Sequence, residues 1–440
     1  MLHLLKKPFI FWSKLQAWLK IIVGMVLGIA AGITLGSDAQ FLQPIGTVFI
    51  NAIMMMVAPV VFVSLVCGVI SMKDPSRMGR IALKTFAVYF TTMASGTTIA
   101  LFMSSVVFKP GKGVFLSSLT SKGVQQVGPK AFSLIDTLVG MVPANIMVAF
   151  TEGNILQVIV FALLFGVAIT LSGDAAKPVE NFFNALSAVL FKFVGIVMSF
   201  APYGVFALMA VVSGTQGLEV ITALMHMVGV IYLCCLLVMV LIYGTGLSIA
   251  RLNPLMFFKK MLEAQAVAFS TTSSAATLPA NLKVAENKLG VNKSIAGFVL
   301  PLGSTVNMDG LSTYMGVIAV FAANLYGIDL SISDMLTIVF TCTIAAVGCA
   351  GVPAAGLVVL PMILSAVGLP LEVVGMVAAV NRVIDMVSTT MNITGDTFAS
   401  VIVAKSEGEL DLEVYNDGKA VSEPLGLDTR EQEQYSPIFN

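Results

Sequence analysis

Residues 270–279 read STTSSAATLP, and this stretch decides how the chain must fold. Long apolar segments surround it, but a run of hydroxyl residues and a proline makes a poor transmembrane interior. Lys259 and Lys260 precede the stretch, while Lys283 and Lys288 follow it. Because cytoplasmic loops of membrane proteins carry an excess of lysine and arginine, both flanks belong on the cytoplasmic side. The segment is therefore predicted to be a re-entrant hairpin that enters and leaves on one side.

A second interrupted stretch, AAVGCAGVPAAG at residues 345–356, has different flanks. The neighbouring segments GIDLSISD and VGLPLEVVG contain no lysine or arginine, so this stretch should enter from the outside. Two hairpins of opposite entry form an inverted repeat, which points to a transporter site near the middle of the bilayer. Irregular backbone is tolerated at that depth only where protein or a water-filled cavity surrounds it.

The composition indicates a membrane protein. Of the 440 residues, 57% are hydrophobic and 11% are charged, against about 25% charged residues in a soluble domain. A span needs about 20 apolar residues, and it must be helical because its backbone groups have to pair within the segment. Candidate spans lie near residues 17–36, 42–72, 79–108, 149–172, 184–212, 218–250, 296–326 and 371–404. The predicted fold class is an all-α polytopic membrane protein with eight transmembrane helices and two re-entrant helical hairpins in inverted-repeat topology.

Both ends of the chain are predicted to be cytoplasmic. Residues 1–20 resemble the start of a signal peptide, but the apolar stretch behind them can span and no A-x-A-like cleavage site follows. This favours an uncleaved first helix. Residues 405–440 are polar and acid-rich, and they are predicted to form a disordered cytoplasmic tail. Lysines before the first span support this orientation in an inner (plasma) membrane, although the lysines between residues 109 and 130 oppose it.

Polar residues gather on one face of the last predicted span. Their positions i, i+3, i+4, i+7 and i+11 are occupied by Asp385, Ser388, Thr389, Asn392 and Asp396. Another carboxylate, Asp309, lies within GSTVNMDGLSTYMG at residues 303–316. A carboxylate in the middle of a span costs about 2.5–3.5 kcal/mol. Only Arg382 is close enough in sequence to neutralise one of the three, so these carboxylates are predicted to bind cations.

The residue types indicate which cation would bind. Side-chain oxygens of asparagine and aspartate, with carbonyls freed where a helix breaks, are hard ligands that suit an alkali cation. A transition metal would call for histidine or cysteine, but His3 and His226 lie apart from this cluster and the five cysteines lie in apolar segments. Tyr89 and Thr92, one turn apart, could add oxygens; hydrogen bonds from these hydroxyls to neighbouring backbone explain them equally well.

Four motifs now resemble a known family. In order and spacing, STTSSAATLP, GSTVNMDG, AVGCAGVPAAG and STTMNITGD are similar to the signature segments of the sodium-coupled glutamate and neutral amino acid transporters, the dicarboxylate/amino acid:cation symporters. MMMVAPVVFVSLVCGVIS near the second span is similar too, so the resemblance covers nearly the whole chain up to Lys405. It implies a prokaryotic-type homotrimer in the lipid bilayer that works as an elevator, with the second hairpin as outer gate. Neither an enzymatic reaction nor a nucleic-acid partner is expected.

The resemblance also implies a domain division. A scaffold would contain residues 1–72 (helices 1 and 2) and residues 131–215 (helices 4 and 5). The moving transport domain would contain helix 3, within residues 73–130 together with an outer loop, and its core at residues 216–404. That core would consist of helix 6, hairpin 1, helix 7, hairpin 2 and helix 8. Residues 405–440 would be the disordered acidic tail.

Carried over by position, the resemblance implies two to three sodium ions. One would be held by the carbonyls of Gly303, Asn307 and Asn392 and the carboxylate of Asp396. A second would be held by Thr305 and the carbonyls of Ala346, Val347 and Cys349. A third would be held by Tyr89, Thr92, Asn307 and Asp309. Met93 stands where the family has a hydroxyl residue beside the third site, so the number of ions stays open.

For the substrate, the resemblance implies a pocket between the hairpin tips and the last span. The residues expected to line it are Ser273, Ser274, Leu311, Val352, Asp385, Ser388, Thr389 and Asn392. The α-carboxylate would meet Ser274 and Asn392, and the α-amino group would meet Asp385. Ser388 replaces the arginine that acidic amino acid transporters of the family carry, and Leu311 replaces a threonine. A small neutral amino acid such as serine, alanine or threonine is therefore the predicted substrate.

Three alternatives remain open at this point. The first is a sodium- or proton-coupled symporter of acidic amino acids or dicarboxylates that uses Arg382 as the counter-charge. The second is an intramembrane aspartyl protease, since two aspartates on separate spans could share a proton and activate water. The third is an anion channel, which should line its pore with arginine or lysine.

Overall fold

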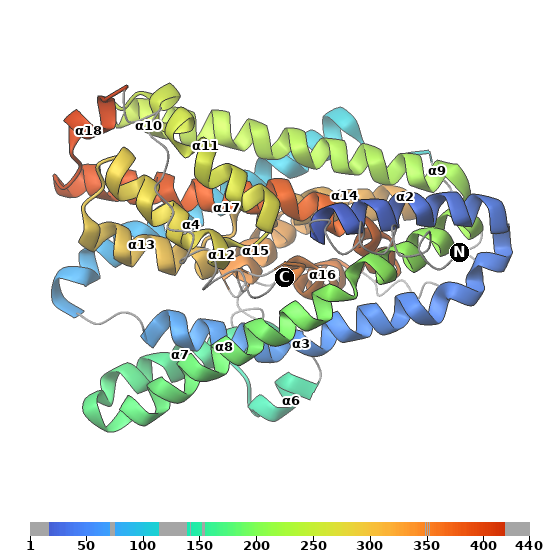
Figure 1. The fold of residues 1–440 in the computed structure, drawn as a ribbon, viewed down its shortest axis with the longest axis horizontal. Coiled ribbons are helices and arrows are strands. Elements are labelled where there is room, and N and C mark those ends of the chain that lie inside the picture. Colours follow the sequence, from blue (N-terminus) through green and yellow to red (C-terminus); the bar gives the residue numbers. More distant parts are fainter. Residues whose placement is uncertain are drawn as a thin grey trace, which may run out of the picture.

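The computed structural model describes residues 17–70, 75–113, 139–140, 142–151, 155–347, 349, 351 and 353–418. Every regular element in these ranges is a helix, and the only bridged pair, Val291 and Leu410, is isolated. Figure 1 shows the long helices packed side by side along one direction. This all-helical architecture confirms the all-α part of the predicted class, because helices satisfy their backbone groups without neighbours.

The helix bounds follow the hydrophobic pattern. The first half of the chain contains α2 (Ala17–Leu35), η1 (Gly36–Leu42), α3 (Gln43–Ile70), α4 (Pro75–Phe102), η2 (Met103–Phe108), α6 (Ile146–Thr151), α7 (Ile155–Leu171), η3 (Gly173–Ala176) and α8 (Lys177–Ser199). The second half contains α9 (Ala201–Val238), η4 (Met239–Tyr243), α10 (Gly244–Ile249), α11 (Pro254–Thr271), α12 (Ser274–Lys283), η5 (Val284–Lys288), α13 (Lys293–Val306), α14 (Asp309–Tyr326), α15 (Ile332–Val347), α16 (Ala355–Ala366), α17 (Val373–Glu407) and α18 (Leu412–Asn416).

Several of these segments could cross a membrane by length and composition. Within the described ranges there are six: Leu19–Ala52, Gly79–Phe108, Gly173–Val197, Glu219–Ile249, Lys293–Tyr326 and Val373–Glu407. Their surroundings differ. The apolar window of Lys293–Tyr326 is 100% buried within the protein, whereas that of Gly173–Val197 is 6% buried. The first therefore lies at the centre of the bundle, and the second presents its side chains outward.

One predicted span is wrong. Residues 184–212 do not form one helix, because α8 ends at Ser199 and α9 starts at Ala201 with Pro202 in its first turn. A proline lacks the backbone N–H that would continue the earlier helix, so it favours a new start. Gly217, at φ 79°, then interrupts α9 in a backbone conformation that glycine adopts readily.

Both interrupted stretches form helical hairpins. In the first, α11 and α12 meet at Thr272, a non-glycine residue with φ 54°, and Ser273 caps α12 by accepting the N–H of Ala276. In the second, α15 and α16 are joined by a segment that ends at Ala354, with φ 64°. The two tips touch: Ser273 Oγ donates to the carbonyl oxygen of Gly351 at 2.7 Å. We name these units hairpin 1 and hairpin 2.

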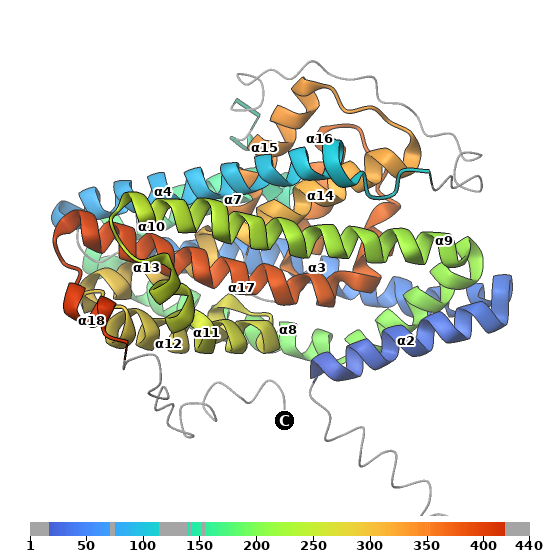
Figure 2. The ribbon, with the colours of Figure 1, turned by 90° about the horizontal axis from the view of Figure 1, so that it is seen from above.

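The helix that contains residues 293–326 is interrupted where the sequence predicted a break. Asn307 and Met308 leave the helical conformation between α13 and α14, at φ −106° and −98°. The other central element, α17, runs through the middle of the molecule, and Figure 2 shows hairpin 1 and hairpin 2 towards opposite sides of it. Polar backbone freed at 307–308 is thus enclosed by protein, as irregular backbone within a membrane protein requires.

The start of the predicted disordered tail is corrected by the structure. Residues 405–407 still belong to α17, and α18 packs against the base of hairpin 1. Tyr415 is fully buried there, and its hydroxyl donates to the carbonyl oxygen of Asn253 at 3.0 Å. Composition alone missed this, because one buried aromatic residue and a few backbone hydrogen bonds are enough to fix a short segment. Residues 1–16 and 419–440 lie outside the described ranges.

Candidate functional site

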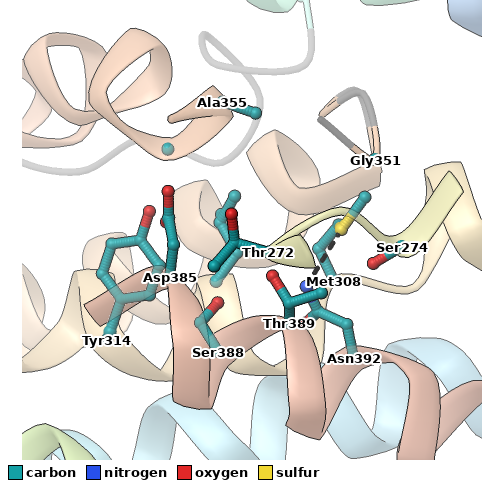
Figure 3. Close-up of a pocket in the computed structure, with 12 residues that line it drawn as sticks. Thr272, Ser274, Met308, Tyr314, Gly351, Ala355, Asp385, Ser388, Thr389 and Asn392 are labelled. Carbon is teal, nitrogen blue, oxygen red and sulfur yellow. Dashed lines mark hydrogen bonds between the residues drawn. The ribbon is translucent and has the colours of Figure 1, made fainter. Parts of the chain in front are cut away.

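A small cavity lies where the two hairpin tips meet α14 and α17 (Figure 3). It is lined by Thr272, Ser274, Met308, Leu311, Tyr314, Gly351, Ala355, Gly356, Asp385, Ser388, Thr389 and Asn392. Its volume of about 20 Å³ suits about one water molecule. The site is therefore assembled but closed, and a larger ligand requires a hairpin to move.

Asp385 ties α17 to hairpin 2. Its Oδ2 accepts the backbone N–H of Ala354 at 2.8 Å and the Nδ2 of Asn381 at 2.9 Å. Asn381 precedes Asp385 by four residues, so it lies one turn away on the same helix face. Ala354 is the N-cap residue just before α16, and its N–H has no acceptor inside that helix. The carboxylate thus satisfies an N–H group of the gate-like tip while it faces the cavity.

Most of the predicted substrate residues are brought together, with two exceptions. Ser274, Leu311, Asp385, Ser388, Thr389 and Asn392 all line the cavity. Ser273 does not, because its hydroxyl is turned towards Gly351 of hairpin 2. Val352 lies outside the described residues. The side chain of Asn392 is held in place, since its Oδ1 accepts the N–H of Gly310 at 2.7 Å.

The third predicted sodium group surrounds Asp309. Thr92 Oγ1 donates to Asp309 Oδ1 at 2.8 Å, and Asp309 is fully buried. The hydroxyl of Tyr89 donates to the carbonyl oxygen of Val299 at 2.7 Å, which leaves its lone pairs available. A residue that the sequence analysis missed, Tyr243, donates to Asp309 Oδ2 at 2.6 Å. Hydroxyl groups from α4 and η4 thus contact the carboxylate of Asp309 on α14.

The first predicted group lies beside it. Asn307 Nδ2 donates to Asp396 Oδ1 at 3.1 Å, while Asn307 Oδ1 is buried with no hydrogen-bond partner among the described residues. Gly303 allows this approach, because a Cβ there would overlap the Asp396 carboxylate. Buried polar atoms are normally paired, so an unpaired amide oxygen between two carboxylates has the character of a cation ligand.

The charge balance of these two groups agrees with that chemistry. Asp309 and Asp396 are both buried, and no lysine or arginine in the described ranges forms an ion pair with either. A buried carboxylate without a counter-charge is unfavourable. The donor set therefore fits a sodium ion, which would bring the missing positive charge and accept oxygen ligands.

The second predicted group lies at the end of α15. Ala346, Val347 and Cys349 are buried, and the N–H of Cys349 donates to the carbonyl of Ala346 at 3.3 Å. Thr305 lies on α13, and its hydroxyl donates to the carbonyl of Leu302 at 3.1 Å. Helices α13 and α15 are in contact with each other.

Three polar residues of the site were missed by sequence reasoning: Thr272 and Tyr314, which line the cavity, and Tyr243. Tyr243 is separated from its partner Asp309 by 66 positions. Tyr314 lies within the stretch GSTVNMDGLSTYMG at residues 303–316 and lines the cavity. A tyrosine within an apolar run was the only available signal, and it does not say which carboxylate or cavity the hydroxyl will meet.

With this geometry established, comparison with known proteins identifies the family. The sodium:dicarboxylate symporter family matches residues 17–406. The chain belongs to this family. Its members are secondary transporters and not enzymes, so the protease alternative is wrong and the prediction of no enzymatic activity is confirmed. A channel that acts without symport is likewise not what the family name describes.

Named relatives of this symporter cover almost its whole length. It is 34% identical over 411 residues to a proton/sodium-glutamate symport protein of Geobacillus stearothermophilus, which covers 92% of this chain and 96% of the relative. It is 33% identical over 403 residues to a C4-dicarboxylate transport protein of Bacillus subtilis, with 89% and 94% covered. It is 34% identical over 414 residues to a proton/glutamate-aspartate symporter of Escherichia coli, with 90% and 93% covered.

Proposed function

We propose that this chain is a sodium- or proton-coupled symporter that imports an acidic amino acid and uses Arg382 as the substrate's counter-charge. The names of the relatives, which specify glutamate, aspartate and C4-dicarboxylates, favour this alternative over the neutral substrate predicted from the sequence. The geometric observation that supports the proposal is that the Arg382 side chain is buried and forms no ion pair with a described residue.

Arg382 is a buried cation that forms no ion pair with a described carboxylate, and the nearby carboxylate of Asp385 offsets the cost of burying its charge only in part. It is 6% exposed, its Nε has no hydrogen-bond partner, and no ion pair joins it to a described carboxylate. Its one hydrogen bond, from an Nη atom to the carbonyl oxygen of Thr271 in hairpin 1, is long at 3.5 Å. A buried guanidinium in this condition is unfavourable until an anion reaches it. A substrate carboxylate is an anion that matches its forked donors.

The position of Arg382 suits this role. It lines a cavity that also contains Asn381, Asp385 and Ala354, and Asp385 lines the substrate cavity as well. Arg382 precedes Asp385 by three residues, so the two side chains lie on neighbouring positions of one helix face. In the proposed complex, the α-amino group meets Asp385, the α-carboxylate meets Ser274 and Asn392, and the distal carboxylate reaches Arg382.

Coupling would come from cations held by the groups around Asp309, Asp396 and the end of α15. With two to three sodium ions bound, each net positive charge that enters gains about 2.3 kcal/mol per 100 mV of membrane potential. The closed cavity requires hairpin 2 to open and close, and cations at the carbonyls of Ala346, Val347 and Cys349 would favour closure. The proposal includes a multi-pass inner-membrane homotrimer with cytoplasmic ends and elevator motion, which rest on the family resemblance.

One observation favours a second candidate, import of a neutral amino acid. Among the described residues no lysine or arginine lines the substrate cavity itself, and Ser388 and Leu311 both line it. A serine-like substrate has no side-chain charge, so it would fit this cavity without contact with Arg382. The two candidates therefore differ in whether Arg382 touches the substrate.

Uptake into proteoliposomes tests the proposal. Labelled aspartate and labelled serine are each offered with and without an inward sodium gradient, and again with an inward proton gradient. We expect aspartate uptake that needs one of the gradients. Serine uptake with inert aspartate would replace the acidic candidate by the neutral one. Absence of gradient dependence for both would overturn symport of amino acids.

The variant Arg382→Met tests the counter-charge. Loss of charged hydrogen bonds should lower aspartate affinity about 100-fold while serine affinity stays the same. Arg251→Met, at an exposed arginine outside both cavities, is the matched control and should change neither. An unchanged aspartate affinity in Arg382→Met, with normal sodium-dependent thermal stabilisation, would contradict the role of this arginine.

A further inference from the structure

One hydroxyl in the substrate cavity has no partner. Tyr314 on α14 is 1% exposed, and its hydroxyl is buried without any hydrogen-bond partner among the described residues. It nevertheless lines the cavity that contains Asp385. A phenol hydroxyl buried in this way has lost its hydrogen bonds to water and gained none in return. Its burial lowers the stability of the fold unless a ligand forms a hydrogen bond with it.

None of the described groups around this hydroxyl forms a hydrogen bond with it. Asp385 already accepts two hydrogen bonds through Oδ2, from Ala354 and Asn381. On the other side, hairpin 2 lies so close that a Cβ at Gly356 would overlap the Tyr314 hydroxyl. The backbone therefore makes room for the oxygen at this position without offering it a hydrogen bond.

The location within the cavity suggests which part of a ligand is involved. In Figure 3, Ser274 and Asn392 lie at one end of the labelled group, and Tyr314 lies at the other end beside Asp385. The hydroxyl of Tyr314 and the carboxylate of Asp385 point the same way, towards Ala355 of hairpin 2. If Ser274 and Asn392 receive the α-carboxylate and Asp385 the amino group, the substrate side chain extends to the Tyr314 end.

We propose that Tyr314 is a specificity-determining residue whose hydroxyl forms a hydrogen bond with an oxygen atom on the substrate's side chain. This rests on the proposed function, because it requires an amino acid in this cavity. The bond selects substrates with a side-chain carboxylate or hydroxyl against aliphatic ones of similar size. An aliphatic side chain would leave the phenol unpaired, and a site built to pair a polar group rejects an analogue that lacks it.

The apolar residues of the cavity strengthen this selection. Met308 and Leu311 also line it, and neither can form a strong hydrogen bond with a side-chain oxygen. The hydroxyls of Ser388, on α17, and of Thr272, at the tip of hairpin 1, belong to other elements that also line the cavity. Removing the Tyr314 hydroxyl should therefore reduce selectivity without preventing binding.

Tyr314→Phe tests the assignment because it removes one oxygen and keeps the ring. The matched control is Tyr326→Phe on the same helix. Among the described residues the buried hydroxyl of Tyr326 also has no partner, but it lies outside the cavity. The affinities of aspartate, serine and 2-aminobutyrate are measured for purified protein in saturating sodium. 2-Aminobutyrate resembles serine in size and lacks its hydroxyl.

We expect Tyr314→Phe to bind aspartate and serine about tenfold more weakly and 2-aminobutyrate equally well, while Tyr326→Phe changes nothing. The unfolding temperature of Tyr314→Phe should not fall, since no protein hydrogen bond is lost. Equal weakening for all three ligands, or unchanged affinities, would overturn the assignment while the proposed function stands. Failure of the unmodified protein to bind any of the three would overturn the proposed function and this inference together.

Discussion

Hairpin 1 and hairpin 2 have the same architecture but are fastened in different ways. Each is a pair of helices whose tip contains a non-glycine residue at positive φ, Thr272 at 54° and Ala354 at 64°. The base of hairpin 1 is held by a buried lysine and by the C-terminal residues. The tip of hairpin 2 is held by Asp385 and by Ser273. Hairpin 1 is thus held at its base by a buried ammonium group, and hairpin 2 is held at its tip, beside the cavity, by two hydrogen bonds.

The anchor of hairpin 1 centres on Lys260, which is 1% exposed. Its Nζ donates to the carbonyl oxygens of Lys288 at 2.9 Å, Val414 at 2.7 Å and Tyr415 at 2.8 Å. All three donors of the ammonium group are therefore used. Burial raises the pKa of the Tyr415 phenol, which keeps this residue a hydrogen-bond donor.

Residues 409–416, which we name the C-terminal strap, add backbone contacts. The N–H of Asn292 donates to the carbonyl of Glu409 at 3.2 Å, and the N–H of Asp411 donates to that of Gly290 at 2.9 Å. Just before the strap, Glu407 forms ion pairs with Arg80 and Lys84 of α4. The strap therefore joins α17 and the base of hairpin 1, and Glu407 connects the same end to α4.

The largest expected effect comes from breaking the anchor. Lys260→Met leaves three buried carbonyls without their charged donor, and it should lower the free energy of unfolding by about 3 kcal/mol. Thermal unfolding of the purified protein measures this. Lys259→Met, at the exposed neighbouring lysine, should have almost no effect. Equal stability of the two variants would show that the strap does not anchor hairpin 1.

Removal of sodium tests whether hairpin 2 opens more easily without bound cations. Cys349 lies in the tip segment of hairpin 2 and is 1% exposed, so its alkylation reports opening. In a Cys67→Ser background, withdrawal of sodium should raise its alkylation rate about tenfold, because bound cations favour the closed state.

A second reporter makes this result specific to hairpin 2. Ala264→Cys in a Cys67→Ser, Cys349→Ala background places a thiol on α11 of hairpin 1, at a buried position outside the cavity. Its alkylation should not respond to sodium. If both thiols respond equally, the two hairpins open together, and the difference in anchoring has no functional consequence.

The smallest expected effect concerns backbone strain at the hairpin 2 tip. Ala354→Gly should stabilise the closed tip by about 1 kcal/mol, because glycine adopts positive φ without the steric cost that alanine carries. Alkylation of Cys349 should slow accordingly. Ala355→Gly, one residue further and helical, should act in the opposite direction, since glycine weakens a helix. Faster alkylation in Ala354→Gly would contradict this account.

The face of α17 was the part of the site that the sequence predicted best. Asp385, Thr389 and Asn392 line the cavity, and Asp396 meets Asn307, because a helix places residues three and four apart on one side. The break at Asn307 and Met308 and the two hairpin turns were also predictable, since polar residues, glycine and proline interrupt apolar helices. The substrate was not predictable in this way, because the identity of Ser388 does not reveal where Arg382 points.

By itself, then, the sequence determined that this protein is helical, that it has a membrane protein's composition, that two polar stretches interrupt it and that three carboxylates lie among apolar residues. Those features depend on amino-acid composition and on the spacing of polar and apolar residues over a few positions of the chain. Only the tertiary structure decided that Tyr243 reaches Asp309, that Ser273 turns away from the cavity, that Tyr314 remains unpaired and that Lys260 binds the C-terminal strap. These contacts join residues that are distant in sequence, and packing of whole helices, rather than any local preference, brings them together.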